Sequence, residues 1–543
     1  MTPTAMDRLA LTVITFLPAF FAVALVFFPR GKQVTDAHGH THYTGDNAIK
    51  WMVLTVAIIT FFLSLHLPAH FDYSTAGFQP RFEVDLNWIK SPAINYHLGV
   101  DGISMWLVIL TTFLVPLSIL IQWDSIHGRV KEFMILILLL ETAMTGVFLA
   151  LDLFLFYVFW EATLIPMALL IGIYGHERSV YAAVKFFLYT MVASVFMLGA
   201  IIWLYIHVGT FDYSVIRAAI AAGAVPGFAE AAKWLFLGFF IAFAVKVPLF
   251  PFHTWLPDAH VEAPTAGSVL LAGVLLKMGT YGLMRFNVAL FPEQARINAP
   301  WIATLAIIGI IYGALVALVQ PNLKKLVAYS SVSHLGFVVL GIFSFTTAGA
   351  DGAVYQMLNH GVSTGALFML AGMLYDRRHT YEIKQFGGLA TPMPIYAMLF
   401  LIITLSSIGL PLTNGFVGEF LVLSGAFQAK SLYGALAATG VIWSAGYMLW
   451  LYQRTFYGEI THDLNRHLPD VNLRERISMF PLVAMAIIMG LFSPYWMQAI
   501  DPSSRLINGA WNPAIRATNA QAMPSHAVAV PSQITNRRSP ISR

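Results

Sequence analysis

The sequence contains no cysteine among its 543 residues. Disulfide bonds and iron–sulfur clusters held by cysteine thiolates are therefore excluded. No phosphate-binding glycine loop, catalytic triad or zinc motif stands out either, so the chain offers no redox or covalent catalytic centre of its own. If the protein takes part in a redox process, the electrons must travel through other chains.

Charged residues are also scarce. They make up 11% of the chain, whereas a soluble domain carries roughly 25%. Hydrophobic residues make up 58%, and the mean hydropathy is +0.71. These values exclude a water-soluble protein. The net charge of +4 comes from few residues, and no basic patch is interleaved with aromatic side chains. Nucleic-acid binding is therefore excluded as well.

Long apolar runs recur along the whole chain. A transmembrane helix needs about 20 such residues, and the first run is too long for the core of a signal peptide. We therefore predict an all-α polytopic membrane protein of about fourteen transmembrane helices. The expected spans are 9–28, 51–69, 102–122, 132–151, 153–174, 181–207, 233–256, 262–285, 299–320, 326–346, 352–375, 393–425, 431–453 and 477–499.

Lysine and arginine concentrate in the loops that follow odd-numbered spans. Positively charged short loops stay in the cytoplasm. This bias predicts a multi-pass membrane protein with both termini outside the cytoplasm. The arginines of the C-terminal tail favour the opposite orientation.

Two of the expected spans combine helix breakers with an ionisable residue. The seventh contains Lys246 beside Pro248, and the twelfth contains Pro411 before Glu419. They lie five helices apart, and a repeat of five helices must invert its topology. Interrupted helices at matching positions of inverted repeats are typical of transport pathways. We therefore predict two inverted five-helix repeats, formed by helices 4–8 and 9–13, with broken helices 7 and 12.

This organisation divides the chain into five parts. They are an N-terminal three-helix segment (1–131), a first repeat (132–286), a second repeat (299–457), a last transmembrane helix (477–499) and a polar C-terminal tail (500–543).

Ionisable side chains lie inside several of the apolar runs. A charge at the bilayer centre costs roughly 2.5–3.5 kcal/mol, so each must be paired, hydrated or neutral. Groups poised between charged and neutral forms exchange protons readily. We interpret them as a proton relay, although structural ion pairing stays open as an alternative, above all for Glu141. The candidates are Glu141, Glu161, Lys246, Lys277, His334, His360 and Glu419.

A short histidine cluster, His38, His40 and His42, lies in the first loop. Its spacing does not match that of known zinc sites. We interpret it as a solvated loop, and we predict no metal site in the chain.

Three long stretches resemble the signature of the antiporter-like subunits of respiratory complex I. They are VKVPLFPFHTWLPDAH at 245–260, LLKMGTYG at 275–282 and KLVAYSSVSHLG at 325–336. The shorter motifs Phe159-Trp160-Glu161 and Asn359-His360-Gly361 extend the resemblance over about residues 130–450. Glu419 is a further mark, because many related antiporter chains carry lysine at that position.

The resemblance implies roles for the matching residues. Glu161 and Lys246 would form an acid–base pair on the uptake side, and Lys277 would be the central relay. His334 and His360 would pass protons along the middle of the membrane to Glu419, the acid on the release side.

The resemblance also implies the partners. The chain would bind no cofactor, while NADH, FMN, iron–sulfur clusters and quinone would be bound by other subunits of the complex. The antiporter-like subunits L and N would lie on either side of it in the lipid bilayer. The function so implied is proton translocation coupled to quinone reduction by NADH:quinone oxidoreductase. Two alternatives stay open: a subunit of a multi-subunit cation/proton antiporter, and an inert membrane scaffold.

Overall fold

The computed structural model describes residues 4–35, 41–126 and 128–509, so His38, His40 and the tail 510–543 lie outside the described residues. In chain order the helices are α1 (Ala5–Phe27), α2 (Asp46–Ser64), α3 (His66–Ala69), α4 (Ser104–Ile121), α5 (Val130–Leu149), α6 (Leu153–Ala162), α7 (Leu164–Tyr174), α8 (Ser179–Val208), α9 (Tyr213–Ala221), α10 (Phe228–Lys246), α11 (Trp255–Glu262), α12 (Thr265–Leu270), η1 (Leu271–Leu275), α13 (Leu276–Gly282), η2 (Leu283–Val288), α14 (Pro292–Leu318), α15 (Leu323–Ile342), α16 (Thr347–Arg378), η3 (Ile383–Gln385), α17 (Pro394–Ser407), α18 (Asn414–Ala429), α19 (Ser431–Phe456), η4 (Asp463–Asn465), α20 (Leu473–Leu491) and α21 (Pro494–Asn508).

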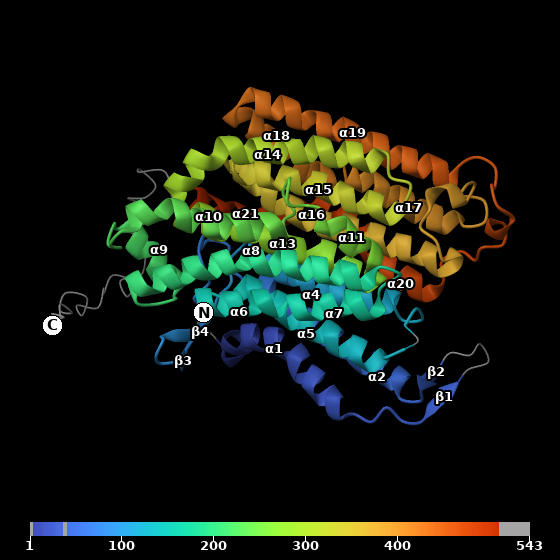
Figure 1. The fold of residues 1–543 in the computed structure, drawn as a ribbon, viewed down its shortest axis with the longest axis horizontal. Helices are drawn as coiled ribbons and strands as arrows, with labels where there is room; N and C mark the ends of the chain where they lie inside the picture. The colour runs from blue at the N-terminus through green and yellow to red at the C-terminus, as the bar shows by residue number, and fades with distance from the viewer. Residues whose placement is uncertain (1–3, 36–40, 127, 510–543) are drawn as a thin grey trace.

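The long helices lie side by side along a common direction (Figure 1). Two short antiparallel hairpins mark the ends of this bundle. One pairs β1 (Gln33–Thr35) with β2 (Thr41–Tyr43), and the other pairs β3 (Val84–Ile89) with β4 (Ile94–Leu98). In the view of Figure 1 they lie at opposite ends, and the start of α1 lies at the same end as the β3–β4 hairpin.

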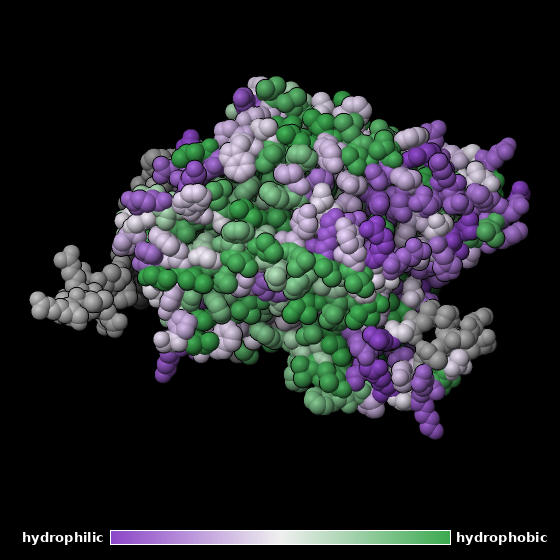
Figure 2. Space-filling view, viewed as in Figure 1, coloured by the Kyte–Doolittle hydropathy of each residue, from purple (hydrophilic) through white to green (hydrophobic). Residues whose placement is uncertain are grey.

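The membrane-spanning character predicted from the sequence is confirmed. In the described part of the chain, 12 helical segments are long and apolar enough to cross a membrane, and α20 with α21 makes a thirteenth if the bent pair is one span. The expected twelfth span is divided into the shorter apolar helix α17 and the helix α18, so the structure supports 12 or 13 of the roughly fourteen expected spans. Figure 2 shows a broad hydrophobic band across the bundle, with hydrophilic residues gathered toward its ends.

The last span differs from the prediction. It was expected at 477–499, but α20 ends at Leu491 and the chain bends by 70° into α21. The first residues of the expected polar tail are therefore helical. Ser503 Oγ accepts a hydrogen bond from the Gly102 amide at 3.1 Å, and a Cβ at Gly102 would meet the Ala499 carbonyl oxygen at 1.8 Å. This close approach packs α21 across one end of the bundle.

Both predicted helix breaks are present. α10 ends at Lys246 and α11 begins at Trp255, whose Nε1 donates to the Val245 carbonyl at 2.9 Å. In the second break, between α17 and α18, Gly409 has φ +74°. A Cβ there would lie 2.9 Å from Glu419 Oε2, so a glycine lets the broken backbone approach the buried carboxylate.

The same backbone pairing occurs in both halves of the chain. At the start of α6, the Leu153 amide donates to the Phe211 carbonyl at 2.9 Å, and the Tyr213 amide donates to the Leu151 carbonyl at 2.8 Å. Five spans later, the Leu323 amide donates to the Tyr381 carbonyl at 2.9 Å, and the amide of residue 383 donates back to the carbonyl of residue 321 at 2.8 Å. This recurrence favours the proposed five-helix repeat.

A charged network holds the β3–β4 hairpin to the bundle. His97 Nδ1 lies 2.6 Å from Asp212 Oδ2, and its Nε2 lies 2.8 Å from Glu83 Oε1. Burial opposes the charged ring, but the hydrogen bonds to these two carboxylates raise the pKa of His97 to about 10. The folded protein therefore keeps His97 protonated at neutral pH.

This network makes the first prediction. A folded-state pKa raised above the unfolded value of 6.5 gives stability that is complete below pH 6.5 and is lost as the pH rises through about 10. The variant His97→Gln should lower the free energy of unfolding by about 2 kcal/mol or more near pH 6, because it leaves two carboxylates unpaired. Thermal unfolding of the purified chain in detergent at several pH values measures the difference. A gap between wild type and variant that stayed constant up to pH 11 would contradict the assignment.

Candidate functional site

Glu161 lies on α6 and Lys246 lies at the end of α10, and both helices contact α8. Lys246 is fully buried at the end of α10, and its Nζ donates to Thr163 Oγ1 at 3.3 Å. The ammonium lies 5.2 Å from the centre of the Trp160 ring, which is a favourable cation–π position. Glu161 is half-buried and accepts a hydrogen bond from Ser194 Oγ.

The two residues interact electrostatically but do not touch. The charge of Glu161 acts on Lys246, yet no ion pair within 4.0 Å joins them among the described residues. Thr163 lies against the lysine and Ser194 against the glutamate. Each charge thus has its own hydroxyl partner within the described residues, and the functional pairing of Glu161 with Lys246 stays a prediction.

Lys277 lies at the centre of the bundle on an irregular helix. The span 265–288 alternates between α and π geometry, with η1 before α13 and η2 after it. π segments are frequent at functional sites, because they displace side chains from regular helical positions. Lys277 is fully buried, donates to the Ala272 carbonyl oxygen, and its Nζ lies 2.6 Å from His360 Nδ1.

His334 and Glu419 form a second buried contact. His334 Nδ1 lies 2.9 Å from Glu419 Oε1, which also accepts from Gln356 Nε2 at 3.1 Å. The other nitrogen of His334 lies 3.4 Å from the Tyr447 hydroxyl. Four helices, α15, α16, α18 and α19, therefore meet at this group.

These two contacts join into one chain of ionisable groups. The ring centres of His334 and His360 are 5.9 Å apart. The sequence Lys277–His360–His334–Glu419 therefore crosses α13, α16, α15 and α18 with short steps. The structure thus brings together four of the seven residues that the sequence singled out.

Glu141 stays outside this chain. It is fully buried on α5, and neither carboxylate oxygen has a hydrogen-bond partner within the described residues. No charged residue among them balances it.

Two further buried groups were not singled out from the sequence. The His260 ring stacks on Phe368 with centres 4.3 Å apart, and the charges of both Lys324 and Lys277 act on it. Lys324 is fully buried and donates to the Ala263 carbonyl at 2.5 Å. Lys324 lies between the expected spans 299–320 and 326–346, where a lysine indicates a loop, so the sequence does not predict its burial. His260 was read only as part of a longer motif, although a histidine between apolar residues was a usable signal.

A polar cavity of about 710 Å³ lies at one end of the bundle. Its lining includes Tyr381, over whose ring the Lys324 ammonium lies 5.1 Å from the centre. His176 also lines it, and burial together with the nearby Lys324 charge lowers the pKa of His176 to about 4. The cavity reaches Thr265 at the start of α12, the same helix that leads to Lys277. The cavity therefore opens at the end of the span that carries Lys277, and Lys277 itself is not among its lining residues.

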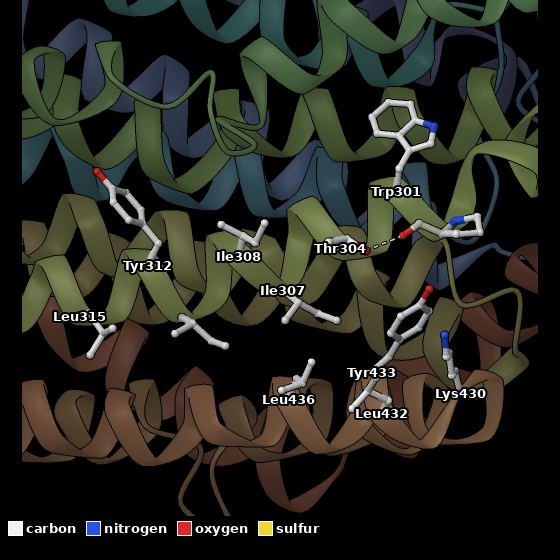
Figure 3. A pocket seen from close by; sticks show the side chains of 12 residues that line it. Trp301, Thr304, Ile307, Ile308, Tyr312, Leu315, Lys430, Leu432, Tyr433 and Leu436 are labelled. Atoms are coloured by element: carbon white, nitrogen blue, oxygen red, sulfur yellow. Dashed lines mark hydrogen bonds between the residues drawn. The ribbon is translucent and has the colours of Figure 1, made fainter.

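A second pocket, of about 810 Å³, lies between α14 and α19 (Figure 3). Its lining is mainly aliphatic and aromatic, with Lys430 at one end. None of the buried ionisable candidates lines it. We assign it to the lipid-facing surface rather than to the site.

The comparisons with known proteins agree with this geometry. The family model for the transmembrane region of NADH:quinone oxidoreductases and Mrp antiporters matches residues 150–444, more than half of the chain. The fold and the site together define a polytopic membrane bundle with buried, closely spaced ionisable groups. The chain belongs to this family of antiporter-like membrane subunits, and the resemblance noted in the sequence is confirmed.

Two individual relatives match this chain over most of its length. NADH-quinone oxidoreductase subunit M of Rhodobacter capsulatus is 47% identical over 500 residues, which cover 91% of this chain and 95% of that one. NADH-ubiquinone oxidoreductase chain 4 of Marchantia polymorpha is 43% identical over 457 residues, covering 84% and 90%.

Solved structures share the fold. A chain of respiratory complex I from Thermus thermophilus superimposes with a TM-score of 0.81 at 33% identity, covering 92% of this chain and 100% of that one. A chain of the Mrp complex from Dietzia sp. gives 0.78 at 20% identity, covering 95% and 99%. At that identity the second match speaks for the fold alone.

Proposed function

We propose that the chain is the subunit M type of proton-translocating membrane subunit in NADH:quinone oxidoreductase. The observation that carries this proposal is the continuous buried chain from Lys277 to Glu419. Its groups can gain and lose protons, lie within hydrogen-bonding or one-water distance of each other, and are shielded from lipid. The relatives named subunit M and chain 4 support the same assignment.

In the proposed relay, the proton moves along the contacts between the buried side chains. A proton on Lys277 Nζ passes to His360 Nδ1 across 2.6 Å. His360 Nε2 has no partner within the described residues, so a water molecule can carry the proton across the 5.9 Å between the histidine rings. His334 then delivers it to Glu419 through the 2.9 Å contact.

Lys324 and His260 provide a route of supply. Lys324 borders the polar cavity through Tyr381, and His260 lies within the electrostatic reach of both Lys324 and Lys277. Water in the cavity would load Lys324, and the proton would reach Lys277 by way of His260. In the orientation that the loop charges favour, this cavity opens to the cytoplasm and both termini lie outside.

Glu161 and Lys246 provide the control element. When a proton binds Glu161, Lys246 loses the negative charge that stabilises its ammonium form, and its proton becomes easier to release toward Lys277. Two charge states of one pair are the kind of two-state element that carries coupling between distant sites.

The partners follow from this proposal. NADH, FMN, iron–sulfur clusters and quinone are bound by other subunits, and the antiporter-like subunits L and N lie on either side in the bacterial inner membrane.

Copurification tests the proposed function. Gentle solubilisation and affinity capture of the full chain should bring down flavin- and iron–sulfur-containing subunits, detected by their absorption spectra. Capture of cation-antiporter subunits alone would instead support the alternative that the shared Mrp fold allows.

Lys277 is the most sensitive position in the relay. Lys277→Met should permit assembly and reduce proton pumping by about tenfold or more, because acid–base groups typically contribute at least that much. Lys277→Arg should also impair pumping, because a guanidinium stays protonated. Pumping into inverted membrane vesicles, measured with a pH-sensitive dye, reports the effect. The exposed Lys233→Met is the matched control and should pump normally. Normal pumping by an assembled Lys277→Met complex would leave the scaffold alternative standing.

The Glu161–Lys246 switch predicts a non-additive pair. Glu161→Gln should damage pumping more than Glu161→Asp, and the double variant Glu161→Gln/Lys246→Met should lose much less than the sum of the two single losses. Ser194→Ala removes the hydrogen bond to Glu161 but keeps both charges, so it serves as the control and should act mildly. Strictly additive losses in this cycle would refute the switch.

A further inference from the structure

Three potential metal ligands meet near the start of the first helix, far from the relay in sequence. Asp7 lies on α1, His66 begins α3, and His70 follows α3 directly. One ligating atom from each lies within 4.8 Å of the other two. His66 and His70 are four residues apart, so they project from the same side of one helical turn, and their ring centres are 4.1 Å apart.

The carboxylate of Asp7 is held so that one oxygen faces the histidines. Oδ2 accepts hydrogen bonds from the Thr4 amide at 2.7 Å and from Thr4 Oγ1 at 2.8 Å, and Arg81 Nε lies 2.9 Å away. Oδ1 is left for His66, whose Nε2 lies 2.9 Å away. A metal-bound carboxylate commonly has this arrangement, with one oxygen on the ion and the other fixed by hydrogen bonds.

His70 is also oriented by the backbone. Its Nδ1 lies 3.2 Å from the His66 carbonyl oxygen, which can only accept a hydrogen bond. Protonation of Nδ1 leaves Nε2 with a free lone pair, the usual state of a metal-binding imidazole. Asp7 is buried, His66 is half-buried and His70 is exposed, so an ion can reach the group from solution.

We propose that Asp7, His66 and His70 form a Zn²⁺ site. Two imidazoles and one carboxylate are a common zinc donor set, with water in the fourth position. Tetrahedral ligands at about 2.0–2.2 Å from zinc lie roughly 3.4 Å apart, so the exposed His70 ring must move inward on binding. Arg81 opposes the cation, and we therefore expect weaker binding than in a fully enclosed structural site. Bound zinc would join the start of α1 to α3, which directly follows α2.

Calorimetric titration of the full-length chain in lipid nanodiscs with Zn²⁺ alone tests the site. His70→Ala is the first variant because an exposed side chain can be removed without disturbing packing. It should weaken zinc binding at least tenfold. His70→Cys should keep binding, because a thiolate is also a zinc ligand and the chain has no other cysteine. The exposed His467→Ala is the matched control and should bind as wild type does.

Two results would overturn the proposal. One is an unchanged dissociation constant in His70→Ala, and the other is an equal loss in His467→Ala. Metal-free melting temperatures of wild type and His70→Ala should coincide, which separates loss of a ligand from loss of fold. His66→Asn, tested the same way, should abolish binding and so links the second histidine to the same ion.

Discussion

Hydrocarbon offers no partner to a charge, so every ionisable group inside this bundle must be satisfied by the protein or by water held within it. Arg285 meets this requirement through Asp101, at 2.5 Å, and Lys277 through His360 and a backbone carbonyl. The Arg285–Asp101 and Lys277–His360 contacts join segments that are distant in sequence. Because buried charges are tolerated only in such contacts, these contacts also determine how the segments pack. The positions of the proposed relay residues follow from that packing.

The sequence predicted the features that hydropathy contrast makes visible. A charge inside an apolar run and a proline inside a span stand out locally, so the two helix breaks and residues such as Lys277 and Glu419 were found without a structure. The side chain that each buried residue contacts was not visible in the sequence, because contacting residues such as His334 and Glu419 are 85 residues apart. Nor could the sequence predict the two π segments, η1 and η2, that lie on either side of α13. The burial of Lys324 was not predicted, because in the sequence a lysine in the first turn of a helix looks the same as a lysine in the preceding loop.

Besides the water-bridged step between the two histidine rings, the proposed relay has an open step between Lys246 and Lys277. No hydrogen bond joins the two lysines within the described residues. Gly279 packs directly on the break after α10, since a Cβ there would meet the Val247 amide nitrogen at 2.9 Å and the Phe243 carbonyl oxygen at 3.0 Å. A dry backbone contact of this kind conducts no proton. Transfer across it requires a lysine side chain to swing or water to enter, which makes this contact the natural place for control.

Polar atoms without protein partners indicate where that water binds. Buried polar atoms are nearly always hydrogen-bonded, to protein or to ordered water. Within the described residues, both ring nitrogens of His253 and His260, the Nε2 atom of His360 and the Oδ1 atom of Asn359 lack such partners. His253 belongs to the interrupted segment between α10 and α11, His360 belongs to the central chain, and Asn359 precedes it on α16. Water at His260, His360 and Asn359 would hydrate the central histidines, and water at His253 would hydrate the interrupted segment after α10.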